Sequence, residues 1–156
     1  MSRQGIAQNY AQVPDTLSLP AAHLISLNSL TLAPAAELSI IVPTFNERDN
    51  VTNLIAAISE MLPGISWEII FVDDNSPDGT ASFVREIARA DPRIRCLHRF
   101  GRRGLSSACV EGIMSTASPI IAVMDADGQH DERALRRMFQ LLAATDADIV
   151  VGQPLC

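Results

Sequence analysis

The segment Pro-Ile-Ile-Ala-Val-Met-Asp-Ala-Asp-Gly-Gln-His-Asp, residues 119–131, joins an apolar run to two closely spaced carboxylates. The run from Ile120 to Met124 is unbroken, which is typical of a β-strand buried on both faces of a parallel sheet. Asp125 and Asp127 therefore stand where this strand leaves the core. Neighbouring carboxylates repel each other and lose hydration, so a cation or a hydrogen-bond network must offset that cost.

A divalent metal is the simplest such cation. Asp125, Asp127 and Gln129 present hard oxygen ligands on alternate residues, which suits Mg2+ or Mn2+ held together with substrate phosphates. A calcium-binding loop that began at Asp125 would need glycine and glutamate at its sixth and twelfth positions, where this chain has histidine and arginine. The plainer alternative is a polar turn in which Asp131 caps the following helix.

The composition of the chain limits its class. Its 156 residues are 47% hydrophobic, which is enough for one domain with a real core. A formal net charge of -6 leaves no basic surplus for nucleic-acid phosphates, so we expect no nucleic-acid partner. Three cysteines without metal-binding spacing favour a reduced, cytoplasmic setting. No apolar run has the length of a membrane span, so we expect any membrane association to be peripheral, at the inner face, or through a partner chain.

The order of the elements predicts the fold class. Residues 1–36 show no sustained periodicity, and we expect a flexible, disordered tail there. After residue 37, apolar runs typical of strands alternate with helical patterns. This alternation predicts an α/β fold with a mostly parallel sheet and right-handed crossovers. The expected strands cover residues 38–42, 67–72, 94–97, 120–124 and 148–151, and the last two helices cover about 105–115 and 132–143.

In a parallel sheet the strand-to-helix loops share one edge, so four loops of this chain should converge. They cover residues 43–47, 73–78, 98–104 and 125–129. In a 3-2-1-4 strand order, ligands of open α/β sheets bind at the switch point between the first and fourth strands. The residues with unusual chemistry all lie in these loops.

Each loop allows a functional and a structural interpretation. Phe45 and Glu47 could form a wall for a nucleobase and ribose after Pro43, or they could plug the core and favour a helix start. Asp74 could accept hydrogen bonds from a base or ribose, although its loop also has a typical turn composition. The loop 99–104 is the densest positive patch and leads into a helix N-terminus, which suits a phosphate or a solvated turn. Together the loops suit a nucleoside diphosphate that carries a group to be transferred.

Four motifs in this order resemble those of family 2 glycosyltransferases with the GT-A fold. They are LSIIVPTFNE (38–47), VDDNSPDGT (72–80), RRGLSSA (102–108) and MDADGQH (124–130). The branch they resemble is the dolichol-phosphate or polyprenyl-phosphate mannosyltransferases, over about residues 38–152. The resemblance implies a Rossmann-like three-layer sandwich and a donor-binding domain over residues 37–156. It also implies transfer of mannose or glucose from a GDP- or UDP-type nucleoside diphosphate sugar, with a lipid phosphate as a candidate acceptor.

The resemblance also implies roles for single residues. Those that would line the nucleotide-sugar site are Pro43, Phe45, Glu47, Asp74, Arg103, Asp125 and Asp127. Those that would hold Mg2+ or Mn2+ are Asp125, Asp127 and Gln129, and the first two would form the catalytic pair. In such enzymes the acceptor attacks the anomeric carbon with inversion, and an anionic lipid phosphate would need no general base.

Members of this branch normally continue beyond the Val-Gly at residues 151–152 with an acceptor-side half, so we expect that half to be missing here. This motivates a second hypothesis, a truncated nucleotide-binding or interaction fragment without transferase activity. A phosphotransferase that uses Asp-X-Asp as nucleophile and acid is a third. We disfavour it because that chemistry needs a downstream lysine, and the chain contains none.

Overall fold

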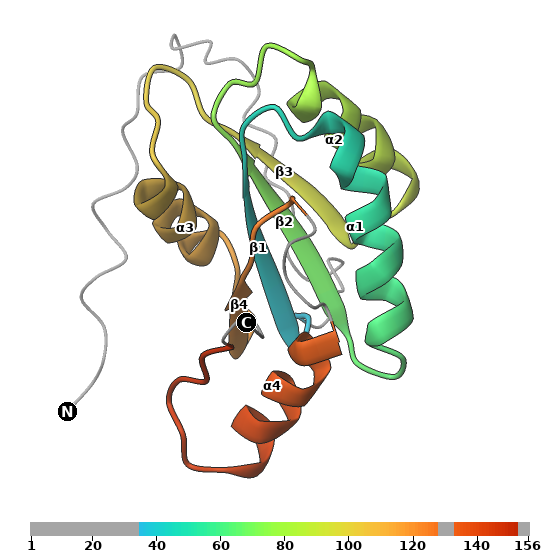
Figure 1. The fold of residues 1–156 in the computed structure, drawn as a ribbon, viewed down its shortest axis with the longest axis vertical. Coiled ribbons are helices and arrows are strands. Elements are labelled where there is room, and N and C mark those ends of the chain that lie inside the picture. The colour runs from blue at the N-terminus through green and yellow to red at the C-terminus, as the bar shows by residue number, and fades with distance from the viewer. Residues whose placement is uncertain (1–34, 128–132, 153–156) are drawn as a thin grey trace, which may run out of the picture. The chain divides into compact units, whose positions relative to one another are not determined.

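The structure is a computed structural model that describes residues 35–127 and 133–152 of the chain. Apart from its last two residues, the predicted tail, residues 1–36, lies outside this part. Strands and helices alternate throughout, as Figure 1 shows. The elements are β1 (Leu38–Thr44), α1 (Arg48–Met61), β2 (Trp67–Asp73), α2 (Thr80–Ala90), β3 (Ile94–His98), α3 (Leu105–Met114), β4 (Ile120–Val123) and α4 (Arg133–Ala144).

The four strands form one sheet in the order β3-β2-β1-β4, and every pairing is parallel. The predicted α/β class and parallel sheet are therefore confirmed, and the strand order is 3-2-1-4. The switch point lies between β1 and β4, where the connection reverses direction across the sheet. None of the helices in the described ranges is long and apolar enough to cross a membrane.

Helices cover both faces of the sheet, which gives the predicted three layers. Leu38, Ile40 and Val42 of β1 point to one face, where they pack in a cluster with apolar residues of α1, α2 and α4. Ile41 points to the other face and packs with Ala108 of α3. Because successive side chains of a strand alternate between faces, one apolar strand supplies two cores. Figure 1 shows α3 on the opposite side of the sheet from α1 and α2.

Two strand predictions need correction. The segment 120–124 was expected to be buried on both faces, but β4 lies at the sheet edge and Val123 is 50% exposed. The strand expected at 148–151 does not form, and Ile149 and Val151 are 76% and 77% exposed. An apolar run indicates β-propensity, but a strand also needs a neighbour that supplies hydrogen bonds and cover. The run itself does not reveal whether that neighbour is present.

Candidate functional site

The carboxyl ends of the strands bring their loops to one level. Thr44 of β1 pairs with Asp73 of β2, and Asp73 pairs with His98 of β3. On the other side of β1, Val123 pairs with Ile41, and the chain follows β1 for one more residue beyond β4. The predicted convergence of the loops is therefore present at the carboxyl edge of the sheet, the fourth loop being described only up to residue 127.

The loops after β1 and β2 are joined by hydrogen bonds. The backbone N–H groups of residues 46–48 donate to Ser76 Oγ, Thr80 Oγ1 and Asp78 Oδ2 at 3.0, 3.1 and 3.2 Å. Helix α1 has no side-chain cap from its own N-cap residue, and free N–H groups at a helix start require acceptors. The second loop supplies them, so the start of α1 is occupied by protein groups and the two loops form one unit.

Asp73, at the end of β2, holds the turn that begins the second of these loops. It is fully buried, and its carboxylate accepts hydrogen bonds from Ser76 N at 2.9 Å and from Ser76 Oγ at 2.5 Å. Such bonds from an aspartate to a residue three positions later hold a tight turn. Asp73 therefore shapes the loop, whereas its neighbour Asp74 faces a cavity.

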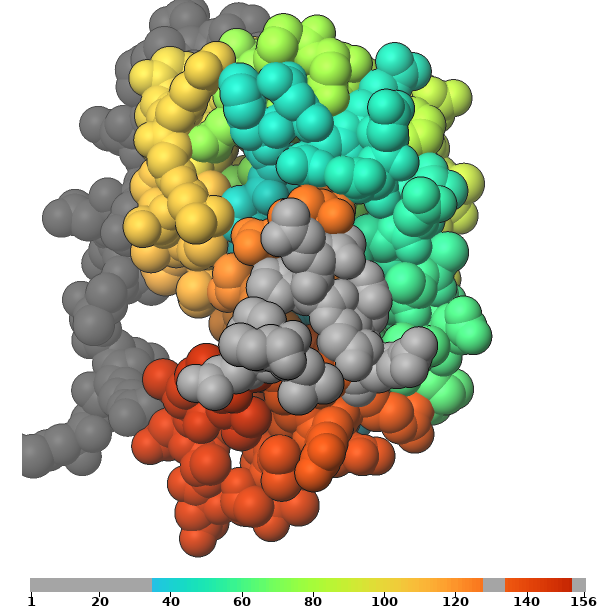
Figure 2. All heavy atoms as spheres, viewed as in Figure 1, coloured from blue at the N-terminus to red at the C-terminus, as the bar shows by residue number. Residues whose placement is uncertain are grey.

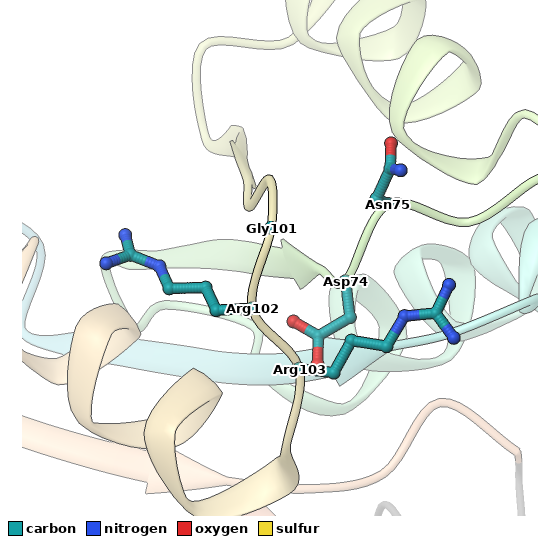
Figure 3. Close-up of a pocket in the computed structure, with 5 residues that line it drawn as sticks. All are labelled: Asp74, Asn75, Gly101, Arg102 and Arg103. Carbon is teal, nitrogen blue, oxygen red and sulfur yellow. The ribbon is translucent and has the colours of Figure 1, made fainter.

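The cavity at this edge has a volume of about 320 Å³. It is lined by Asp74, Asn75, Gly101, Arg102 and Arg103, which come from the loops after β2 and β3. Figure 3 shows that Arg102 and Arg103 extend in opposite directions from their loop. The wall from the loop after β2 therefore carries an acidic group, and the wall from the loop after β3 carries two basic groups. Such a site suits a ligand with both hydrogen-bond donors and negative charge.

Arg103 also reaches the loop after β1. Its guanidinium lies over the ring of Phe45, 4.6 Å from the centroid, and Phe45 is 43% exposed. A guanidinium over an aromatic face is held by the ring quadrupole. Two predicted site residues from loops 58 positions apart are thus in contact.

Pro43 and Glu47, two further predicted site residues, do not line the cavity. Pro43 is half-buried within β1, and Glu47 precedes α1, where its carboxylate accepts a hydrogen bond from Asn50 Nδ2 at 2.6 Å. Glu47 belongs to the joined loops and Pro43 to β1. The structural interpretation of Glu47 as a helix-start residue agrees with this contact.

Asp125 and Asp127 follow β4 and are exposed. Met124, which precedes Asp125, and Ala126, which separates the two aspartates, are buried in the core. Both aspartates are therefore accessible to solvent, directly after the strand. Figure 2 shows the orange segment after β4 at the surface between the teal start of α1 and yellow α3. Two adjacent hard oxygen donors fit Mg2+ or Mn2+. Gln129, the third predicted ligand, lies outside the described residues, and no group of three His, Cys, Asp or Glu side chains that could hold a metal occurs within them.

Asp125 is close enough to α3 to influence a cysteine there. Burial raises the pKa of the Cys109 thiol, and the negative charge of Asp125 raises it further. Burial also raises the pKa of Cys96 to about 11. Both thiols are therefore protonated at neutral pH, and neither has the thiolate character of a catalytic nucleophile.

Sequence reasoning missed Arg99. The basic patch 99–104 was interpreted as a phosphate seat or a solvated turn, yet the side chain of Arg99 is buried and its residue is only 2% exposed. A signal was present, since Arg99 directly follows β3 at the edge where the loops converge. Only its partners, which lie up to 25 residues away in sequence, distinguish it from its exposed neighbours.

Comparison with known proteins agrees with this geometry. The model of the family described as "Glycosyl transferase family 2" matches residues 39–155. A dolichol-phosphate mannosyltransferase of Pyrococcus furiosus is 34% identical over 74% of this chain and 32% of its own length. A polyprenol monophosphomannose synthase of Mycolicibacterium smegmatis is 34% identical over 78% of this chain and 46% of its own length. The chain thus spans between about a third and a half of these relatives.

Solved structures give the same fold. A mannosyltransferase from Pyrobaculum calidifontis, in complex with GDP-Man and Mn2+, superimposes with a TM-score of 0.59 and 28% identity. The match covers 70% of this chain and 33% of the other. TarS of S. aureus, at 21% identity and a TM-score of 0.55, shares the fold. With its parallel sheet, its converging loops and a family match over most of its length, the chain belongs to glycosyl transferase family 2 and is related to the polyprenyl-phosphate mannosyltransferases.

Proposed function

We propose that this domain binds a nucleoside diphosphate sugar at the carboxyl edge of its sheet and forms the donor side of a glycosyl transfer. The observation that carries the proposal is the cavity between the loops after β2 and β3, with Asp74 on one wall and Arg102 and Arg103 on the other. The relatives named above are mannosyltransferases, and one solved neighbour holds GDP-Man and Mn2+. These names support GDP-mannose as the first donor to test.

The chemistry of the loops matches the parts of such a donor. A nucleobase needs an apolar wall and hydrogen-bond acceptors, which Phe45 and Asp74 supply, and Pro43 and Glu47 would complete the wall of that pocket. A diphosphate needs cationic groups, and Arg103 lies beside Phe45 at 4.6 Å. Guanidinium groups suit phosphate oxygens because their donors form a planar fork.

Asp125 and Asp127 would hold Mg2+ or Mn2+, with Gln129 proposed as a third ligand. Such a metal stabilises the charge on a departing nucleoside diphosphate. The chain itself would place the two carboxylates directly after β4, beside the switch point of the sheet. Hydrogen bonds between the other loops would keep the base and diphosphate positions fixed relative to them.

We further propose a polyprenyl phosphate as the acceptor, because the relatives named above are dolichol-phosphate and polyprenol enzymes. A phosphate oxygen is already anionic, so its attack on the anomeric carbon needs no general base from the protein. Such an acceptor lies in a membrane, and the domain would therefore work at the cytoplasmic membrane face, peripherally or with a partner chain.

The first experiment measures GDP and UDP binding by calorimetry, with and without Mn2+. We expect metal-dependent binding of GDP, and Asp127→Asn should weaken it at least tenfold, because a metal ligand is lost while side-chain size is kept. Asp146→Asn is the matched control, since it removes an exposed carboxylate that follows α4 and should leave affinity unchanged.

Binding of neither nucleotide by the wild-type chain would contradict the proposal. Sugar transfer to a polyprenyl phosphate, measured with radiolabelled donor, separates a transferase from a nucleotide-binding fragment. Nucleotide binding without sugar transfer is a second candidate function. Metal-dependent binding without any transfer would favour it.

A further inference from the structure

We infer that Arg99 is a positioning residue that holds the β3–α3 loop in the shape needed to receive the nucleotide, an inference that rests on the proposed function. Arg99 is among the largest fully buried side chains of the described residues. A buried guanidinium is costly unless charges and acceptors surround it, so its contacts show what it fixes.

The guanidinium of Arg99 joins three segments. Its Nη1 lies 2.9 Å from Asp74 Oδ1 in the loop after β2 and donates to Gly104 O at 3.3 Å. Its Nη2 donates to Ser107 Oγ of α3 at 2.6 Å, and its Nε lies 3.4 Å from Glu111 Oε1, also of α3. Arg99 thus connects both walls of the cavity to the helix behind them.

Two of these contacts depend on charge alone. Asp74 Oδ1 and Arg99 Nε are buried and form no hydrogen bond, although each lies beside a group of opposite charge. A buried ion pair contributes little net stability but strongly disfavours arrangements that leave one charge unpaired. We therefore assign Arg99 a role in selecting one loop geometry.

The loop is fixed at both ends. At its start, the backbone N–H of Arg99 donates to Asp73 O at 2.8 Å. At its end, the N–H of Gly104 donates to Asp74 Oδ2 at 2.8 Å. Gly104 has a φ of 132°, a region that favours glycine. The segment between these ends carries Arg102 and Arg103 over the cavity.

The position of Arg102 depends on Arg99 through Glu111. The carboxylate of Glu111 faces Arg99 with Oε1, and its Oε2 accepts a hydrogen bond from Arg102 Nη2 at 2.8 Å. Removing Arg99 would leave Glu111 and Asp74 with excess negative charge beside the proposed diphosphate position. A loop that is fixed before binding loses less conformational entropy on binding, which increases affinity.

Arg99→Lys tests this inference, because an ammonium keeps the charge but lacks the planar fork that here makes two hydrogen bonds and two ion pairs at once. Arg95→Lys is the matched control. Arg95 lies on β3, the strand that Arg99 follows. Its Nη1 pairs with Glu68 Oε2 at 3.0 Å and its Nη2 donates to Ser115 O at 2.9 Å, away from the cavity. Each variant is compared with the wild type in amide hydrogen exchange at Gly104 without nucleotide, and in GDP affinity with Mn2+.

We expect Arg99→Lys to accelerate exchange at Gly104 and to weaken GDP binding, each about tenfold, because loop residues must then be ordered on binding. Arg95→Lys should change neither. Unchanged exchange at Gly104 in Arg99→Lys overturns the inference. Faster exchange with wild-type affinity overturns the link to nucleotide binding and leaves the proposed function intact.

The two proposals fail separately. If the wild-type chain binds no nucleotide, the proposed function fails, and so does the link of Arg99 to it, while exchange at Gly104 still shows whether Arg99 fixes the loop. If Arg99→Lys does not fold, Ser107→Ala removes the Nη2 acceptor together with the hydrogen bond that Ser107 Oγ donates to Gly104 O at 2.9 Å. It should give a smaller acceleration at Gly104. No acceleration in Ser107→Ala would overturn the inference in that case.

Discussion

Glu68 lies near the amino end of β2, at the opposite end of the strand from the candidate site. Its Oε1 accepts hydrogen bonds from Ser39 Oγ at 2.5 Å and Thr116 Oγ1 at 2.7 Å, and its Oε2 pairs with Arg95 at 3.0 Å. Burial raises the pKa of Glu68, but the hydrogen bonds from these three side chains outweigh burial and lower it overall. The ionised form is therefore the one that ties the α3–β4 connection to the sheet.

This predicts a pH dependence of stability. A carboxyl with a lowered folded-state pKa stabilises the fold above its unfolded value, about 4.3, and loses that effect as pH falls through the folded value. Glu68→Gln should lower the free energy of unfolding by about 1–3 kcal/mol at neutral pH. The gap to wild type should narrow as the pH falls below the unfolded value and through the lower folded-state pKa of Glu68. Urea unfolding at several pH values measures it.

The control for this prediction is Glu60→Gln, which makes the same chemical change on an exposed position of α1. It should follow the wild-type curve. A Glu68→Gln deficit that stays constant over the whole pH range would show that the lost interactions do not depend on ionisation.

At the scale of the element, α3 is seated on the sheet through Gly112. A Cβ at Gly112 would overlap Ile41 Cγ2 and lie 3.0 Å from Val72 Cγ2. Both of these side chains are fully buried and have little room to move. Helix α3 follows the β3–α3 loop directly, so its seating also sets the position of Arg103.

Gly112→Ala should therefore destabilise the fold by about 1–3 kcal/mol through overpacking. The sign is informative, because glycine to alanine in an exposed helix stabilises by up to about 1 kcal/mol. Ser106→Ala, at an exposed position of the same helix, is the control and should change the free energy of unfolding little. Urea unfolding measures both, and a more stable Gly112→Ala would contradict the packing described.

At the scale of the whole molecule, β4 is an edge strand of the sheet within the described residues, and it has apolar residues in water. Val123 at this edge is 50% exposed, and Val110 and Met114 of α3 are 57% and 80% exposed. Exposed edge strands pair with other chains unless charge or cover prevents it. We therefore expect the chain to self-associate at high concentration.

Val123→Lys should weaken this association at least tenfold, because a charge replaces apolar surface that pairing would bury. Sedimentation velocity over a concentration series measures it. Glu60→Lys is the control, since it adds positive charge on α1, away from the edge. A wild-type chain that stays monomeric at high concentration would contradict the prediction.

Local sequence predicted most elements well because their signals are local. The runs that became β1, β2 and β3 were placed within two residues, and the helix expected at 105–115 forms at Leu105–Met114. The roles assigned to Phe45, Arg103, Asp125 and Asp127 stay predictions, although the first two lie in contact. The segment 148–151 shows the limit, since an apolar run alone does not reveal whether a neighbouring strand exists.

The alternation of apolar runs and helical patterns was sufficient to predict a parallel sheet with its polar loops at one edge. Side-chain periodicity and crossover handedness are properties of short segments, so the local sequence contains them. The burial of Arg99 and the capping of α1 by the loop after β2 depend on contacts between segments far apart in the chain. The free energy of a buried charge or helix start is set by its partners, and those partners are specified only once the chain has folded.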